Sequence, residues 1–269
     1  MNAPRVLAIA AHPDDIEFMM AGTLLELQAA GYEAHYLNVA DGSCGSHAES
    51  AVRTRKRRAG EARAAARILG ARHHPSLARD VEIFYEPRLL RRIAAVVRMV
   101  APSIVLTHSP EDYMEDHTNT ARLAATALFV RGMPNYRTQP PRTAIDGNVT
   151  IYHALPHGLR DAMGRLVIPE SYVDVKAVHA LKLDALAAHK SQQQWLTETQ
   201  GMSSYLASME AMSREVGRMS GRFRLAEGWR RHNPLGFCPA GADPMRDALG
   251  RKHLLNRGYP RGLDARDAG

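Results

Sequence analysis

The sequence predicts an α/β fold of Rossmann-like type, in which helices cover both faces of a mostly parallel sheet and an irregular C-terminal segment follows. Short apolar runs without turn residues alternate with segments of helical periodicity, which is the βαβ rhythm of a parallel sheet. Clusters of polar residues directly follow two of these runs. This placement is expected where strands end at the ligand-binding edge of a doubly wound sheet.

The predicted elements follow one another in a regular order. Residues 5–11 predict a buried strand, and from Ile16 apolar residues recur at helical spacing until Gly31, a typical helix stop. Residues 34–40 predict a second strand. The remaining predicted strands span 103–107 and 149–154, and the remaining predicted helices span 53–69, 88–100, 116–130 and 175–189. No glycine-rich fingerprint follows the first strand, which argues against a dinucleotide site.

The composition is that of a globular protein. Of the 269 residues, 45 % are hydrophobic and 23 % are charged. No apolar run approaches the roughly 18–20 residues of a membrane span, and the N-terminal segment does not resemble a signal peptide. Because Cys44 and Cys238 are the only cysteines, we expect no disulfide framework and a cytoplasmic location.

The net charge of +7 is unevenly distributed along the chain. Residues 53–72 hold eight basic residues and one acid, and residues 228–269 hold eight basic residues and four acids. A nucleic-acid surface interleaves basic residues with aromatic ones, but aromatics are absent from 53–72. We therefore expect no nucleic-acid partner, and the basic run at 53–58 is predicted to be a solvated helix face, except for Arg58, which belongs to a motif discussed below.

Two adjacent carboxylates and an imidazole follow the first predicted strand. His12, Asp14 and Asp15 lie within four residues of one another. Such a group is costly to bury unless a cation compensates the negative charge. One carboxylate could bind a metal ion while the other faces a metal-bound water. The alternative is that Asp14 or Asp15 merely caps the following helix.

A second polar cluster, residues 108–117, follows the strand predicted at 103–107. Loops from neighbouring strand ends converge in a doubly wound sheet, so His117 is expected to meet His12 and Asp15. Two histidines and one aspartate with an open position form a catalytic zinc set. Asp116 could cap the helix that His117 begins or orient a metal ligand.

The segment at 11–17, Ala-His-Pro-Asp-Asp-Ile-Glu, resembles the signature of the LmbE-like, or PIG-L, family of zinc-dependent N-acetylglucosaminyl deacetylases. Segments within 58–70, 112–117, 173–192 and 226–229 resemble further motifs of that family in the same order. The resemblance covers residues 4–230. It implies a deacetylase domain at 1–230, and we expect 231–269 to be a basic tail that is loosely packed or forms an interface.

The resemblance also implies roles for single residues. One zinc ion per chain would be bound by His12, Asp15 and His117, with Asp14 as general base and Arg58 in contact with the sugar. The family pattern has a histidine where this chain has Met114, which can neither donate a proton nor stabilise an oxyanion. We expect another side chain to replace it, with His157 or His189 favoured over Tyr113, a substrate-binding candidate, and His153 as a further candidate.

The implied activity is hydrolysis of the N-acetyl group of an amino sugar such as an N-acetylglucosamine conjugate, a small-molecule substrate. Two alternatives stay open: a non-catalytic sugar- or metal-binding protein, and an amidase for another N-acylated small molecule. Relatives with these motifs imply a trimer or hexamer. A stretch of apolar residues without an obvious core partner favours such self-association; it comprises Trp195, Leu196, Met202, Tyr205 and Leu206.

The remaining histidines have structural interpretations. His35 lies inside a predicted strand and is expected to be a packed residue or an edge residue. His108 follows a strand and could support a metal ligand. Exposed positions are predicted for the others: His47, His73, His74 and His179.

Overall fold

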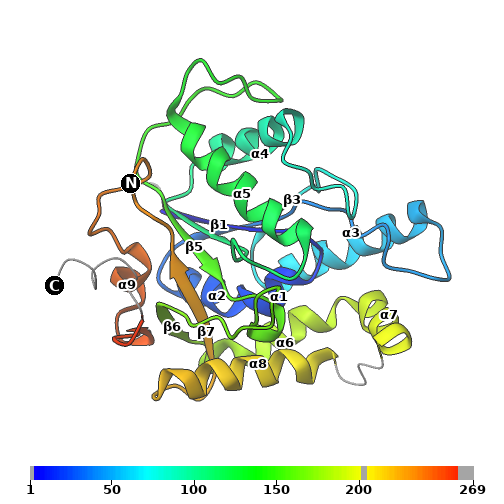
Figure 1. Cartoon of the computed structure of the whole chain (residues 1–269). Helices are drawn as coiled ribbons and strands as arrows, with labels where there is room; N and C mark the ends of the chain where they lie inside the picture. Colours follow the sequence, from blue (N-terminus) through cyan, green and yellow to red (C-terminus); the bar gives the residue numbers. More distant parts are fainter. Residues whose placement is uncertain (1–2, 201–204, 260–269) are drawn as a thin grey trace.

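The structure is a computed structural model that describes residues 3–200 and 205–259, with the side chains of 197–200 left aside. In these residues a single sheet has the strand order β3-β2-β1-β4-β5-β7-β6-β8 (Figure 1). The five strands from β3 to β5 in that order run parallel, and β7, β6 and β8 then alternate in direction. Their bounds are β1 Arg5–Ala10, β2 Glu33–Asn38, β3 Arg72–His74, β4 Ile104–Thr107, β5 Thr150–Ala154, β6 Ser171–Asp174, β7 Ala226–Arg231 and β8 His253–Leu255.

Helices cover both faces of this sheet, which confirms the predicted fold class. α4 and α5 pack on one face, and α1, α2, α3, α6 and α8 pack on the other (Figure 1). The bounds are α1 Asp15–Met19, α2 Ala21–Ala29, α3 Ala51–Ile68, α4 Pro87–Val100, α5 Glu115–Phe129, α6 His179–Ala187, α7 Lys190–Gln200, α8 Tyr205–Ser220 and α9 Pro244–Leu249. No helix of the described part of the chain is long and apolar enough to span a bilayer.

The central strand β1 shows why the sequence pattern is a continuous apolar run. Val6, Ala8 and Ala10 belong to the core on one face of the sheet. Leu7 and Ile9 belong to the core on the other face. Because successive side chains of a strand point to opposite faces, both faces of β1 must be apolar when both are covered by helices.

The helix predicted from Ile16 to Gly31 is interrupted at Met20, which has φ −135°. A buried carboxylate stabilises the new helix start. Glu227 of β7 accepts hydrogen bonds from the backbone N–H groups of Gly22 (2.8 Å) and Thr23 (2.7 Å). A carboxylate at a helix N-terminus satisfies backbone donors that lack partners within the helix. The Lys182 ammonium, 2.8 Å away, neutralises Glu227.

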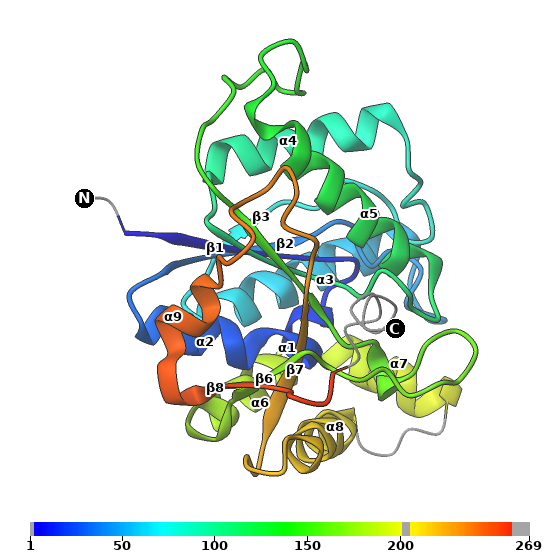
Figure 2. The ribbon, with the colours of Figure 1, turned by 60° about the vertical axis from the view of Figure 1, so that its left-hand side comes forward.

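Residues 244–255, part of the tail expected to be loosely packed or to form an interface, pack onto the sheet. β8 pairs with β6, and Figure 2 shows α9 beside α2. Met245 is fully buried and Leu249 nearly so. Two apolar residues one turn apart in a six-residue helix are too weak a periodic signal to be recognised in sequence. Residues 260–269 lie outside the described residues.

The predictions for His74 and His179 are wrong, because both side chains are buried. His74 belongs to the edge strand β3, and its Nε2 lies 2.9 Å from Nδ1 of His35, which is packed as predicted. Burial, together with the neighbouring His35 and Arg72, lowers the pKa of His74 to about 4. Burial also lowers the pKa of His35. The pair is therefore neutral in the folded protein near pH 7.

This buried pair predicts a loss of stability in acid. Below the ordinary histidine pKa of about 6.5, the unfolded chain binds protons that the folded chain excludes. The free energy of unfolding therefore falls as the pH drops from about 6.5 toward 4. His74→Gln should reduce this slope in urea denaturation series, whereas His47→Gln, at an exposed position, should leave it unchanged. Equal slopes in wild type and His74→Gln would contradict this interpretation.

Candidate metal and catalytic site

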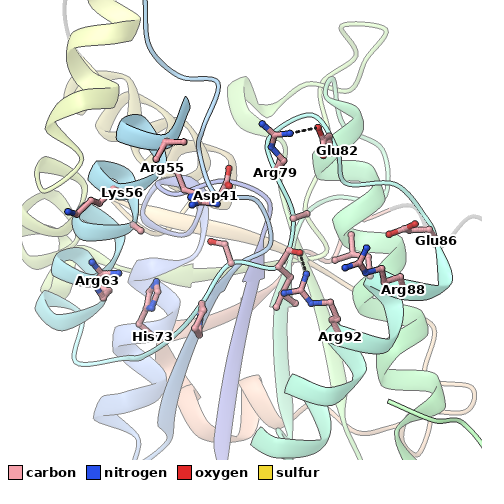
Figure 3. Close-up of a pocket in the computed structure, with 17 residues that line it drawn as sticks. Asp41, Arg55, Lys56, Arg63, His73, Arg79, Glu82, Glu86, Arg88 and Arg92 are labelled. Atoms are coloured by element: carbon pink, nitrogen blue, oxygen red, sulfur yellow. Dashed lines mark hydrogen bonds and ion pairs between the residues drawn. The ribbon is translucent and has the colours of Figure 1, made fainter. Parts of the chain in front are cut away.

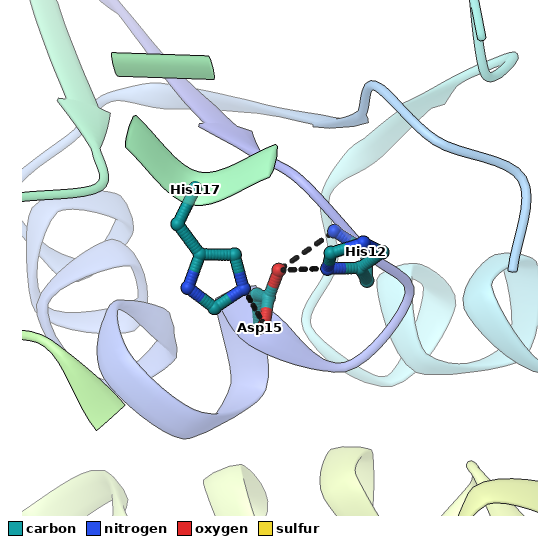
Figure 4. Close-up of side chains that lie close together, drawn as sticks. All are labelled: His12, Asp15 and His117. Carbon is teal, nitrogen blue, oxygen red and sulfur yellow. Dashed lines mark hydrogen bonds and ion pairs between the residues drawn. The ribbon is translucent and has the colours of Figure 1, made fainter. Parts of the chain in front are cut away.

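The two polar clusters meet at the carboxyl ends of the neighbouring strands β1 and β4. The chain leaves β1 through the turn that contains His12 and Asp14, and Asp15 begins α1. His117 lies in the first turn of α5. Since β1 pairs with β4, the loops that follow them share one edge of the sheet. His12, Asp15 and His117 therefore lie close together, as predicted (Figure 4).

Asp15 lies between the two imidazoles. Its Oδ2 is 3.4 Å from Nδ1 of His12, and its Oδ1 is 3.5 Å from Nε2 of His117. One ligand atom from each residue can be chosen so that all three lie within 4.8 Å of one another. The Asp15 carboxylate also accepts the backbone N–H of His12 at 2.6 Å. This arrangement could hold a metal ion.

In each imidazole, the ring nitrogen that points away from Asp15 is hydrogen-bonded to a further carboxylate. His12 donates from Nε2 to Asp116 at 3.0 Å, and His117 donates from Nδ1 to Asp112 at 3.0 Å. Asp116 also accepts the backbone N–H of Val81 at 2.8 Å. These bonds fix the tautomers so that the inner nitrogens face Asp15, an arrangement that supports metal-binding histidines. Asp116 precedes His117 inside α5 rather than capping the helix.

In this cluster, burial and charge pairing shift the pKa of each group in opposite directions. Burial lowers the pKa of His12, but the hydrogen bonds to Asp116 and Asp15 outweigh it and raise the pKa to about 10. Burial similarly opposes a raised pKa in His117, where Asp15 and Asp112 prevail. Burial raises the pKa of Asp15, but His117 and His108 outweigh it and bring it well below its usual range. A cation in this cluster would replace the protons that these imidazoles carry.

His108 supports the site from behind. Its Nε2 accepts the backbone N–H of Ala11 at 2.9 Å and lies 3.3 Å from Asp15 Oδ2. Its ring stacks on that of His117 with 4.1 Å between centroids. His108 therefore fixes the end of β1 against the first turn of α5.

Asp14 occupies a strained and enclosed position beside the cluster. It has φ 111°, in the left-handed region that non-glycine residues rarely adopt, and it is 7 % exposed. Tyr205 donates a hydrogen bond of 2.5 Å to its Oδ2. The Arg58 guanidinium lies 3.5 Å from its Oδ1. Burial raises the pKa of this carboxyl, and the Arg58 charge opposes that increase.

Arg58 leaves the basic face of α3 and enters the site. It is 3 % exposed, and its Nη2 donates to the carbonyl of Pro13 at 2.5 Å. Gly42 makes this possible, because a Cβ there would lie 2.6 Å from Arg58 Cδ. Gly42 also has φ +73°. Arg58 is excepted from the solvated face predicted at 53–58, and the four other basic residues of that run are exposed.

A cavity of about 400 Å³ opens over these residues. His12, Asp14, Asp15 and His117 form one side of it. His157 also lines it, at the start of the short helical turn His157–Leu159, with its ring 5.0 Å from that of Phe18. Other side chains lining the cavity are Arg58, Tyr113, Met114, Gln192, Trp195, Leu196 and Tyr205.

Two of the expected replacements for the missing histidine do not reach this cavity. His189 is fully buried beneath it, 3.5 Å from Glu17. His153 donates to the carbonyl of His108 and contacts His232. Neither belongs to the lining formed by the described residues. His157 and Tyr113 do belong to it, so the ranking of His189 above Tyr113 is wrong.

The apolar stretch used to predict self-association is largely accounted for within one chain. Tyr205 is buried under Asp14, and Trp195 lies against His47 with 4.1 Å between ring centroids. Trp195 and Leu196 line the cavity, and Leu206 packs against the core. Met202 lies outside the described residues. These contacts weaken the argument from the apolar stretch, and the predicted trimer or hexamer stays untested.

Sequence reasoning missed Tyr205 and Asp112 as site residues. Asp112 lies inside the segment 112–117 that resembles a family motif. It is five residues before His117, a spacing that does not place two residues on the same face of a helix, so the sequence did not predict their contact. Tyr205 is 191 residues away from Asp14 in the chain. No local pattern connects positions so far apart.

Comparison with known proteins places the chain in a family. The sequence model of the protein family described as "PIG-L: GlcNAc-PI de-N-acetylase" matches residues 7–128. Diacetylchitobiose deacetylase of Thermococcus kodakarensis is 30 % identical over 199 residues, which are 71 % of this chain and 71 % of the relative. The chain therefore belongs to the PIG-L, or LmbE-like, family.

Two further proteins similar to this chain carry different names, one a hydratase and one a deacetylase. The 4-oxalmesaconate hydratase of Pseudomonas putida is 28 % identical to this chain over 203 residues, covering 72 % of the chain and 76 % of the relative. The solved N,N'-diacetylchitobiose deacetylase of Pyrococcus horikoshii superposes with a TM-score of 0.71 at 24 % identity, covering 91 % of this chain and 89 % of that one. The second likeness confirms the fold of this PIG-L family member.

The contact between Gly42 and Arg58 predicts a stability difference between two glycine substitutions. Gly42→Ala adds both a positive-φ penalty and a clash with a buried guanidinium, so we expect a loss of about 2 kcal/mol or more. Gly164→Ala is the matched control, because Gly164 has φ +77° with nothing within 4 Å of the added Cβ. Urea denaturation of both variants measures the difference, and equal losses would show that Arg58 moves aside freely.

Proposed function

We propose that this PIG-L family member is a zinc-dependent hydrolase that removes the acetyl group of an N-acetylated amino sugar. One observation carries the proposal. The imidazoles of His12 and His117 face the Asp15 carboxylate, while their other ring nitrogens are hydrogen-bonded to Asp116 and Asp112, and the carboxylate of Asp14 lies beside them. The deacetylase relative at 30 % identity supports the reaction class.

The donor set fits zinc. His12, Asp15 and His117 offer two nitrogen ligands and one oxygen ligand, a number that leaves a coordination position open for substrate or water. Zinc held by these residues would supply a Lewis acid that activates water near neutral pH and polarises a carbonyl group. Asp112 and Asp116 would keep the two imidazoles oriented, as the second carboxylates of metal-binding histidines do.

Asp14 is placed to act as the general base. Its carboxylate lines the cavity, where it can take a proton from the attacking water and later return it to the departing amine. Tyr205 and Arg58 restrict the carboxylate to one orientation by contacting one oxygen each. The strained backbone of Asp14 is consistent with a functional constraint on this turn.

His157 is the best-placed substitute for the histidine that Met114 replaces. It lines the cavity together with Met114, and Tyr113 lies nearby with 6.4 Å between the two ring centroids. Burial lowers the pKa of His157, so its ring is neutral near pH 7 and can donate one hydrogen bond. A donor aimed at the developing oxyanion contributes about 10²–10³-fold in turnover.

Hydration of a carbon–carbon double bond is a second candidate activity, favoured by the hydratase relative at 28 % identity. Both reactions add the elements of water, and both need a base to activate it. They differ in the bond that is attacked. Arg58 would contact the sugar in the first case and a substrate carboxylate in the second.

The metal proposal predicts a dependence on Asp112. Wild-type protein should bind about one zinc ion per chain in elemental analysis. Asp112→Asn removes the negative charge behind His117, and zinc affinity should fall by about 10–100-fold in competition with a chromophoric chelator. Glu111→Gln, at the adjacent exposed carboxylate, is the control and should bind zinc as wild type does. Absence of zinc uptake by the wild type would refute the metal site.

The catalytic proposal predicts acetate release that depends on Asp14. Wild-type protein loaded with zinc should release acetate from N-acetylglucosamine or diacetylchitobiose. Asp14→Asn should lower kcat by about 10²–10⁴-fold while zinc binding is retained, because asparagine cannot accept the proton. Acetate is measured with a coupled enzymatic assay over a panel of acylated amines.

The same assay separates the candidate functions. Acetate release from amino sugars alone supports the proposed deacetylase, and release only from other N-acylated amines supports the amidase alternative. Loss of ultraviolet absorbance from unsaturated dicarboxylates, without acetate release, would instead establish the hydratase. Zinc binding with neither reaction would favour a binding protein.

A further inference from the structure

A cleft larger than the catalytic cavity lies between α3 and the chain leading into α4 (Figure 3). Its volume is about 990 Å³, at the upper end of the range for small-molecule sites. The floor is formed by the segment after β3, which includes Pro75, Ser76 and Ala78. The catalytic residues are absent from the lining formed by the described residues, so this is a separate cavity.

Cationic side chains face this cleft from both walls. Arg55, Lys56 and Arg63 of α3 all line the cleft, and Arg63 lies about two helical turns along from the other two. Arg88 and Arg92 come from the first turns of α4, and Arg79 from the connecting loop (Figure 3). Three carboxylates also line the cleft: Asp41, Glu82 and Glu86.

Most of these cations lack a protein counter-charge. Arg79 pairs with Glu82 at 3.6 Å, and Arg92 donates to the carbonyl of Leu77. In the described part of the chain, the ion pairs include none made by the four other cations of the cleft, namely Arg55, Lys56, Arg63 and Arg88. Like charges facing one another across a concave surface focus a positive potential that attracts anions.

The chemistry of the lining selects the kind of anion. Arginine guanidinium groups bind the oxygens of phosphate groups with paired hydrogen bonds, and opposed walls favour more than one phosphate. Phe, Tyr and Trp side chains are absent from the lining formed by the described residues, which argues against stacking of bases. We propose that this cleft binds a small molecule carrying at least two phosphate groups, such as an oligophosphate or a diphosphate ester.

The cleft and the catalytic cavity share a wall. Asp80 accepts the backbone N–H groups of Gly42 at 2.6 Å and Cys44 at 2.9 Å, which joins the two loops that separate them. Asp41 and Arg79 face the cleft, whereas Cys44 and Asp80 line the catalytic cavity. The proposed phosphate site is formed by residues other than the catalytic ones, so it does not depend on the reaction proposed above.

The experiment uses inorganic pyrophosphate and tripolyphosphate as probes in isothermal titration calorimetry with the full chain. Wild type should bind with a Kd below about 1 mM that weakens as NaCl is raised, because exposed charges are screened by salt. The variant Arg55→Gln/Arg63→Gln/Arg88→Gln should bind at least tenfold more weakly. These side chains are exposed, so the thermal unfolding temperature should stay at the wild-type value.

Two control variants keep the result interpretable. Arg53→Gln/Arg57→Gln/Arg67→Gln removes the same charge from α3 outside the cleft and should bind as wild type does. His117→Ala removes a proposed zinc ligand and should also retain binding, which distinguishes the cleft from a metal-bound phosphate. The inference is overturned if both triple variants lose affinity equally, if only His117→Ala loses it, or if wild type shows no binding at 1 mM.

Discussion

The partly buried carboxylate of Asp15 is the constraint around which the site is organised. An ionised carboxylate removed from water is unstable unless charges or hydrogen bonds compensate it, and here three imidazoles surround it. Two of these imidazoles, His12 and His117, are paired in turn with Asp116 and Asp112. The result is an alternating cluster of acids and imidazoles that a cation would complete. The loops after β1, β3 and β4 all contribute to it.

The same reasoning explains why Asp14 and Asp15 differ although they are neighbours. Asp15 faces imidazoles, which bring its pKa well below the usual range despite burial. Asp14 points the other way because of its left-handed backbone, and burial raises its pKa against the opposing charge of Arg58. One carboxylate is thus suited to hold a cation and the other to exchange a proton. Two adjacent aspartates of one turn are therefore suited to different chemical roles.

α3 has two functional sides because of where its arginines point. Arg58 is drawn inward by the Pro13 carbonyl and by Asp14 across a glycine that leaves room for it. Arg55 and Arg63 line the cleft toward α4, and neither makes an ion pair in the described part of the chain. A basic helix that looks uniform in sequence therefore serves two different cavities. Helical periodicity distributes the charges, and the packing partners decide which of them are buried.

The sequence by itself determined the parallel sheet and the meeting of His12, Asp15 and His117. Buried strands are readable as apolar runs, and the topology of such a sheet brings neighbouring strand ends together. Only the tertiary structure decided the contacts of Tyr205, the burial of His189 and His74, and the docking of α9 and β8. Each of these depends on packing between segments far apart in the chain, for which short elements such as β3 and β8 leave no periodic signal.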